Sequence, residues 1–479
     1  MIKKLSIWKA IILVPFLLSA AGLQAKVKLP SILGDNMVLQ QKTAAKLWGW
    51  AKENAKIQVK TSWDKKTYTT TADIKGCWLL KVNTPDAGGP FQIIVSDGEA
   101  LTLNNILIGE VWFCSGQSNM EMPMRGFDRQ PLKGGNNVIA KANPNMPIRM
   151  FTTDSKEGNW VRQFTKTAQT DCQGEWLENS SINVANISAT AYYFARYVRE
   201  ALNVPVGIIV SSWGGSVVES WMSREAIEAF KEINTSILDN DSVVKKPQAT
   251  PCVLYNAKIA PLTNFTIKGF LWYQGESNRK NADLYAKLMP AFVKDLRAKW
   301  NIGEFPFYFV QIAPFNYEGA DSTSAARLRE VQLQNMNEIP NSGMVTTMDI
   351  GEANDLHPQN KKAVGVRMAK AARSLIYNEK IAYSGPIPKS AIVVGKTVKV
   401  FFNHLEESDK VYNLNHFELA SVEGIFSKAS AVRKGKDVYI SCNQVELPKF
   451  LRYAWCDNPA EINFFNESGL PAAGFRLEL

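Results

Sequence analysis

Residues 109–120 read Gly-Glu-Val-Trp-Phe-Cys-Ser-Gly-Gln-Ser-Asn-Met, and they are the strongest indication of the fold. The run at 106–113 is mostly apolar and lacks the regular alternation of a half-exposed strand. A strand that is apolar on both faces is typical of a parallel sheet covered by helices. Ligand crevices in such sheets form outside the carboxyl ends of the strands, so we expect Ser118 to lie in one.

Further apolar runs of the same kind follow along the chain. Stretches between them carry apolar residues at helical spacing. Strands that alternate with helices pair in parallel and receive helices on both faces. The sequence therefore predicts an α/β unit over 105–382, with five strands that include 106–113. The other four strands are expected at 206–211, 267–272, 307–312 and 344–348.

The segments on either side of this unit have a different pattern. Short alternating runs separated by turn residues predict a β-sandwich over 26–104, and strand character returns in a C-terminal β domain over 383–479. Residues 1–25 combine a basic start, a short apolar run and a small-residue exit, which is typical of a secretory signal peptide. An uncleaved anchor is the alternative. We therefore expect an exported protein, periplasmic or extracellular, with no membrane span after cleavage.

Composition excludes several classes of function. The formal net charge of +10 is spread without a long block of like charge, which argues against a nucleic-acid partner. The six cysteines form no C-x-x-C pair and the three histidines form no H-E-x-x-H, so we expect neither a metal nor a cofactor. Cys442 and Cys456 either bridge a hairpin or remain thiols.

The candidate nucleophile requires a base, because a serine hydroxyl attacks poorly until a neighbour accepts its proton. His404 and His416 fall in the C-terminal β region, whereas His357 follows the fifth predicted strand and shares the sheet edge of Ser118. Asp355, two residues upstream, is our choice for the group that orients the imidazole. Read singly, Ser118 and His357 also fit residues that cap helices.

Two further loops are expected at the same edge. Ser212-Trp-Gly-Gly-Ser-Val follows the second predicted strand, and Trp272-Tyr-Gln-Gly-Glu-Ser-Asn follows the third. The backbone N–H of Gly215 and the side-chain amide of Gln274 are candidate donors for an oxyanion hole. An ordinary turn explains each glycine pair equally well, but three loops and a histidine at one edge favour a catalytic site.

Together these motifs resemble those of the SGNH hydrolases, and in particular the sialate O-acetylesterase family. That family carries Gly-Gln-Ser-Asn-Met, Trp-Gly-Gly, Trp-Tyr-Gln-Gly-Glu and a final His-Pro, and the segments 29–40, 452–455 and 469–472 are similar too. The resemblance implies a three-layer α/β/α hydrolase domain with a parallel sheet, flanked by the two β units. It also implies Ser118 as nucleophile, His357 as base, and an oxyanion hole of the Ser118 and Gly215 N–H groups with Gln274. Many SGNH enzymes place Asp three residues before His, where this chain has Asn354, so Asn354 or a backbone carbonyl is an alternative to Asp355.

The function implied by the resemblance is a secreted serine esterase that removes O-acetyl groups from sugars, most naturally 9-O-acetyl groups of sialic acid. Trp221 and Tyr273 flank the loops as well, and such aromatic residues either stack on a sugar or fill the core. An acetyl xylan or pectin esterase, an esterase of lipids, and a non-catalytic glycan-binding protein are the rival hypotheses. The sequence leaves the oligomeric state open. The candidate substrate-binding residues are Gln117, Asn119, Arg125, Trp213, Trp272 and Glu276.

Overall fold

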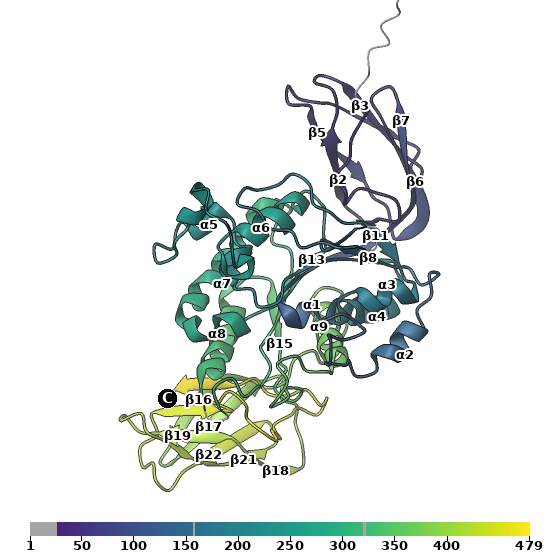
Figure 1. The fold of residues 1–479 in the computed structure, drawn as a ribbon. Helices are drawn as coiled ribbons and strands as arrows, with labels where there is room; N and C mark the ends of the chain where they lie inside the picture. The colour runs from purple at the N-terminus through teal and green to yellow at the C-terminus, as the bar shows by residue number, and fades with distance from the viewer. Residues whose placement is uncertain (1–25, 157–158, 320–321) are drawn as a thin grey trace, which may run out of the picture.

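The protein is built from three consecutive units, which Figure 1 shows as β, α/β and β. The computed structural model describes residues 26–156, 159–319 and 322–479, so the predicted signal peptide lies outside the described residues. Within those ranges, helices long and apolar enough to cross a membrane are absent. The predicted fold class, an α/β domain flanked by β units, is confirmed.

The central sheet has the strand order β11-β8-β12-β7-β13-β14-β15. All neighbours from β8 to β15 pair in parallel, and β11 adds an antiparallel edge. The five predicted strands correspond to β7, β12, β13, β14 and β15. The sequence did not predict β8 and β11. The bounds are β7 (Ala100–Gly116), β8 (Ile148–Thr152), β11 (Trp176–Glu178), β12 (Val206–Ser212), β13 (Gly269–Tyr273), β14 (Phe307–Val310) and β15 (Ser342–Val345).

The register of the sheet brings the predicted motifs to one edge. Gly116 at the end of β7 is paired with Ser212 of β12 and with Tyr273 of β13. A side chain at position 116 would lie 2.1 Å from the Tyr273 carbonyl oxygen, so only glycine fits there. The three motif-bearing loops therefore leave the sheet side by side.

Helices cover both faces of the sheet, giving the predicted three layers (Figure 1). On one face α4 (Ala189–Leu202) and α9 (Lys361–Leu375) pack together, and Phe194 of α4 contacts Trp112 of β7 at 4.8 Å between ring centroids. On the other face lie α7 (Ala282–Trp300) and α8 (Ser324–Glu338). The short helices are α1 (Ser118–Glu121), α2 (Gly135–Ala140), α3 (Ser181–Asn186), α5 (Arg224–Ile227) and α6 (Val253–Lys258).

The N-terminal β unit shares a strand with the catalytic unit. β7 first pairs antiparallel with β6 and then enters the central sheet, so the predicted boundary between residues 104 and 105 falls inside this strand. β1 pairs parallel with β7. β2 pairs antiparallel with β5 in a separate two-stranded sheet. The bounds are β1 (Val38–Gln40), β2 (Ala44–Trp50), β3 (Lys56–Thr61), β4 (Thr67–Thr71), β5 (Cys77–Asn83) and β6 (Gly88–Ser96).

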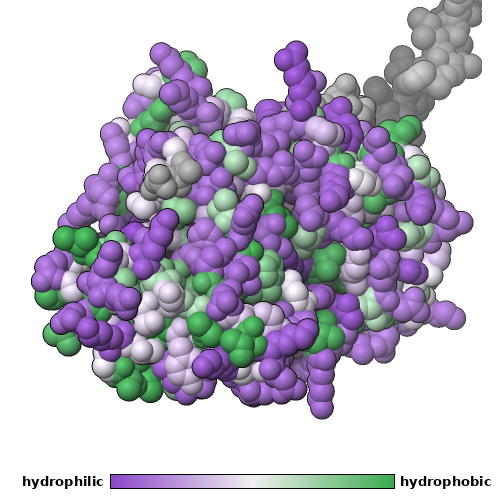
Figure 2. All heavy atoms as spheres, turned by 90° about the horizontal axis from the view of Figure 1, so that it is seen from below, coloured by the Kyte–Doolittle hydropathy of each residue, from purple (hydrophilic) through white to green (hydrophobic). Residues whose placement is uncertain are grey.

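The C-terminal unit consists of two antiparallel sheets, ordered β16-β17-β22-β21-β18 and β20-β19-β23-β24. Asp457 of this unit accepts the Ala325 N–H at the start of α8 at 2.7 Å. Cys442 and Cys456 are not joined by a disulfide. Apolar side chains on the face seen from below are scattered among hydrophilic ones, as is normal for a water-exposed surface (Figure 2). The bounds are β16 (Ile387–Val394), β17 (Thr397–Asn403), β18 (Val411–Leu414), β19 (Phe417–Ala420), β20 (Phe426–Lys428), β21 (Ser430–Lys434), β22 (Asp437–Ser441), β23 (Phe450–Tyr453) and β24 (Phe475–Glu478).

Candidate active site

Ser118 is the first residue of α1, two positions beyond the end of β7. It is 8% exposed, whereas Gln117 before it is 1% exposed. The Gln117 N–H donates to the Tyr273 carbonyl at 3.0 Å, and its side-chain oxygen accepts the N–H groups of Gly275 and Ser277 at 3.4 Å each. The side chain of Gln117 therefore joins two loops of the site, and its contact with substrate stays a prediction.

The imidazole of His357 is held by Gln130, a residue that the sequence analysis missed. His357 Nδ1 lies 3.0 Å from Gln130 Oε1, and Phe127 packs edge-on against the ring with 5.1 Å between centroids. An amide oxygen only accepts, so Nδ1 carries the proton that it receives and Nε2 is left as the basic nitrogen. Within the described residues, the buried Nε2 has no hydrogen-bond partner. His357 Nε2 is thus not hydrogen-bonded to Ser118 in this structure, and its role as the base stays a prediction.

Asp355 supports this arrangement without touching the ring directly. One of its carboxylate oxygens, Oδ1, accepts the His357 backbone N–H at 2.8 Å and the Gln130 side-chain N–H at 2.9 Å, while His357 Nδ1 lies 4.0 Å away. That separation is too long for a hydrogen bond. The expected direct contact between Asp355 and the imidazole is thus replaced by a chain that runs through Gln130. Asn354, the alternative partner, is exposed.

Asn119 ties the nucleophile loop to the histidine loop. Its side-chain N–H groups donate to the Leu356 carbonyl at 3.1 Å and to Glu276 Oε1 at 2.6 Å. The neighbours of Ser118 and His357 in the chain are therefore hydrogen-bonded to each other. Asn119 and Glu276 are 1% and 3% exposed, so these side chains lie beneath the surface of the site. Their contacts with substrate stay predictions.

Lys361, the first residue of α9, completes this buried network. Its ammonium group donates to Asn119 Oδ1 at 2.5 Å and is fully buried. Burial lowers the pKa of Lys361 from 10.5 to about 7, against the opposing effect of Glu276. Burial and then the charge of Lys361 lower the pKa of His357 below 6.5, while Asp355 raises it. Both effects favour the neutral imidazole that a general base requires.

The loop after β12 lies against the nucleophile. The Trp213 N–H donates to the Gly116 carbonyl at 3.0 Å, and a methyl group added to Gly214 would sit 3.6 Å from Ser118 Cβ. Gly215 is exposed and has a φ of +70°, which favours glycine. The role of the Gly215 N–H as an oxyanion donor stays a prediction.

Gln274 supports this loop from behind. Its amide nitrogen donates to the Ser216 carbonyl at 3.0 Å and to Asn278 Oδ1 at 2.7 Å, which uses both of its hydrogens. Gln274 is also fully buried. These contacts hold the Gly215 loop in place, and the role of Gln274 as an oxyanion donor stays a prediction.

The aromatic residues that flank the motif loops differ in burial. Three of them are fully buried: Trp221, Trp272 and Tyr273. The contact of Trp272 with a sugar stays a prediction. Trp213 is partly exposed, and the guanidinium of Arg162 lies 4.6 Å from its ring centroid.

Two cations near the nucleophile loop differ in their surroundings. Arg162 forms an ion pair with Glu121 of α1, although the sequence analysis did not single it out. Arg125, the cation that was predicted, is exposed, and its role stays a prediction. Within the described residues, no three or more His, Cys, Asp or Glu side chains converge as metal ligands would.

Comparisons with known proteins identify the family of the chain. A family model described as carbohydrate esterase, sialic acid-specific acetylesterase, matches residues 108–374 and so includes Ser118 and His357. The chain is 26% identical to the sialate O-acetylesterase of Pongo abelii, over 93% of this chain and 91% of that protein. It is 29% identical to the sialate O-acetylesterase of Homo sapiens, over 75% of this chain and 73% of that protein. A crystal structure of a carbohydrate acetylesterase from Xanthomonas citri is similar with a TM-score of 0.84 and 31% identity, covering 94% of this chain and 99% of that one.

Proposed function

Since the chain belongs to the sialic acid-specific acetylesterase family of carbohydrate esterases, we propose that it hydrolyses O-acetyl esters of sialic acid through an acyl-enzyme on Ser118. Membership makes it a carboxylic ester hydrolase and confirms the resemblance seen in the motifs. The observation that carries the proposed mechanism is the Asn119 bridge. It fastens the residue after Ser118 to the residue before His357.

The reaction proceeds in two halves. In the first, Ser118 Oγ attacks the acetyl carbonyl carbon while His357 Nε2 accepts the hydroxyl proton. The oxyanion of the tetrahedral intermediate accepts hydrogen bonds from the Ser118 and Gly215 N–H groups. Collapse of the intermediate breaks the bond to the sugar oxygen, which leaves with the proton returned by His357. In the second half water replaces Ser118 as the attacking group, which releases acetate and restores the serine.

Gln130 and Asp355 keep the imidazole productive during both halves. The Gln130 oxygen fixes the Nδ1–H tautomer, and the Asp355 carboxylate fixes the Gln130 amide. When His357 becomes positively charged, the Asp355 charge stabilises it through space. The proposed catalytic group is therefore a Ser118–His357 pair, with Asp355 acting through Gln130.

The assignment to sialic acid is supported by relatives named sialate O-acetylesterase. Acetylated xylan and pectin remain the rival substrates, because the solved relative is described only as a carbohydrate acetylesterase. Export of the mature protein is proposed from the leader-like pattern of residues 1–25.

The test of this function is acetate release from four substrates: 9-O-acetylated sialic acid, acetylated xylan, acetylated pectin and 4-nitrophenyl acetate. We expect hydrolysis of the aryl ester and the highest kcat/KM with the acetylated sialic acid. Release from xylan or pectin without release from sialic acid would overturn the substrate assignment. A folded wild-type protein that hydrolyses none of the four would overturn the esterase itself.

A further inference from the structure

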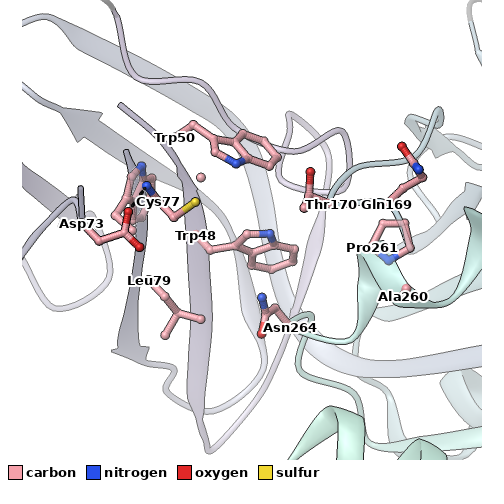
Figure 3. A pocket seen from close by; sticks show the side chains of 12 residues that line it. Trp48, Trp50, Asp73, Cys77, Leu79, Gln169, Thr170, Ala260, Pro261 and Asn264 are labelled. Atoms are coloured by element: carbon pink, nitrogen blue, oxygen red, sulfur yellow. Dashed lines mark hydrogen bonds between the residues drawn. The ribbon is translucent and has the colours of Figure 1, made fainter. Parts of the chain in front are cut away.

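A pocket lies where the N-terminal β unit meets the catalytic unit, well outside the set of residues that surround Ser118. It has a volume of about 420 Å³, within the usual range for ligand sites. Figure 3 shows the side chains of Trp48 and Trp50 on one wall, with Gln169, Thr170 and Pro261 across from them.

The walls of this pocket combine rings with amide and hydroxyl groups. Trp48 and Trp50 alternate along β2 and therefore point to the same face, which they share with Leu79 and Cys77, their partners on β5. The opposite wall supplies the side chains of Gln169, Thr170 and Asn264. Indole rings beside a few polar groups are suited to sugar rings, which have apolar faces and hydroxyl edges.

The charged groups around this pocket bear on whether it suits an anionic or a neutral sugar. The described residues that line it include the carboxylate of Asp73 but neither Lys nor Arg. One Asp73 oxygen already accepts the N–H groups of Lys75 and Cys77 at 2.8 and 2.9 Å. One cation lies close by, because the ammonium of Lys28 is 5.9 Å from the ring centroid of Trp50. Together with the Asp73 carboxylate it gives the pocket one charge of each sign, so its rings, amides and hydroxyl suit a neutral sugar ring.

A second hollow shares one lining residue with this pocket. Its volume is about 470 Å³, and Gln169 lines both hollows. At its other end it reaches Arg162, which pairs with Glu121 in the short helix that Ser118 begins. Arg162 also stacks on Trp213, the residue before the Gly214–Gly215 turn. Gln169 thus relates the Trp50 pocket to a hollow that is lined by Arg162, a residue in contact with the helix of Ser118 and with the loop after β12.

We propose that these two hollows form one groove that binds a neutral oligosaccharide chain and presents its acetylated sugar to Ser118. The presentation to Ser118 rests on the proposed esterase function, but binding at Trp50 does not. The natural substrate would then be an acetylated sugar within or at the end of a longer glycan. A free monosaccharide would leave the Trp48–Trp50 end of the groove empty.

The test measures polymer binding by retardation in native gels that contain xylan, glucomannan or xyloglucan. It uses the full-length protein and the variants Trp50→Ala, Trp50→Phe and Gln169→Ala. We expect the wild type to bind at least one polymer, Trp50→Ala to bind it at least about tenfold more weakly, and Trp50→Phe to restore part of the binding. Trp63→Ala is the matched control, because Trp63 is a partly exposed tryptophan of the same β unit outside both hollows.

The kinetic arm compares kcat/KM on the acetylated form of the bound polymer with kcat/KM on 4-nitrophenyl acetate. The value for the polymer divided by the value for 4-nitrophenyl acetate should fall in Trp50→Ala and Gln169→Ala but not in Trp63→Ala. Failure of the wild type to bind any of the polymers, or equal binding by wild type and Trp50→Ala, would overturn the groove. Loss of all ester hydrolysis with retained Trp50-dependent binding would instead overturn the esterase function and leave the binding site standing.

Discussion

At the scale of single residues, the site depends on how His357 is oriented. Its Nδ1 faces an amide oxygen at 3.0 Å, where a carboxylate was expected from the spacing of residues 355 and 357. Gln130 could not be found from the sequence, because it belongs to a segment without a strand or helix pattern and meets His357 only in the folded chain. Asp355 fixes the tautomer through the Gln130 amide, and its charge acts on the imidazole across 4.0 Å. The electrostatic gain is therefore smaller than direct contact gives.

Replacing Gln130 or Asp355 should therefore lower kcat by similar amounts. We expect Gln130→Ala and Asp355→Ala each to reduce kcat on 4-nitrophenyl acetate about 100-fold, because either change frees the imidazole to turn. The double variant should lose little more than either single variant, since the two side chains act in one chain. Asn354→Ala is the matched control and should retain wild-type kcat. A larger loss for Asn354→Ala than for Asp355→Ala would contradict this arrangement.

The titration of His357 supplies a second prediction at this scale. Its pKa is lowered by burial and by Lys361, and the base must be neutral to work, so activity should persist to lower pH than a free imidazole allows. The acid limb of kcat/KM should lie below pH 6.5. Lys361→Met removes a positive charge that disfavours the imidazolium, so the pKa of His357 should rise and the acid limb should move to higher pH.

Lys362→Met is the control for that profile, because Lys362 is the exposed neighbour of Lys361 and should leave the limb in place. An unchanged limb in Lys361→Met, with the protein folded, would show that Lys361 does not act on His357.

At the scale of elements, the sequence predicted the strands that carry the site because each is a short apolar run buried on both faces. β8 was not predicted because Arg149 interrupts its run of apolar residues. In the structure this arginine is buried, and its guanidinium lies 3.0 Å from the carboxylate of Glu178 in the edge strand β11. The motif loops were placed at the correct edge, since parallel pairing fixes where strands end. Which side chains of those loops face the substrate was not predictable, because Gln117, Asn119 and Gln274 are polar residues whose partners come from other loops.

At the scale of the whole molecule, β7 joins two units that the sequence pattern predicted to be separate. The strand contributes to the N-terminal sheet through β6 and to the catalytic sheet through β12 and β13. Unfolding the N-terminal unit therefore removes support from the strand that leads into Ser118. The C-terminal unit shares no strand with the central sheet in the described part of the chain, and it contacts α8 through side chains such as Asp457.

Core truncations in the two β units should consequently differ in their effect on activity. Ile57→Ala in β3 and Ile440→Ala in β22 both shorten fully buried isoleucines, and each should cost about 2 to 5 kcal/mol within its own unit. We expect Ile57→Ala to lower the temperature at which 4-nitrophenyl acetate hydrolysis is lost by more than Ile440→Ala does. Equal shifts, or a larger shift for Ile440→Ala, would contradict the coupling through β7.

The central claim is that the Ser118 hydroxyl attacks the ester with His357 as its base. It is tested most directly by treating the active protein with a fluorophosphonate, which reacts with activated serines, and mapping the adduct by peptide mass spectrometry. We predict one adduct on Ser118, a much slower reaction in His357→Ala, and a fall in kcat of at least about 1,000-fold in folded Ser118→Ala. An adduct on another serine, or a Ser118→Ala protein that retains ester hydrolysis near the wild-type rate, would contradict the account.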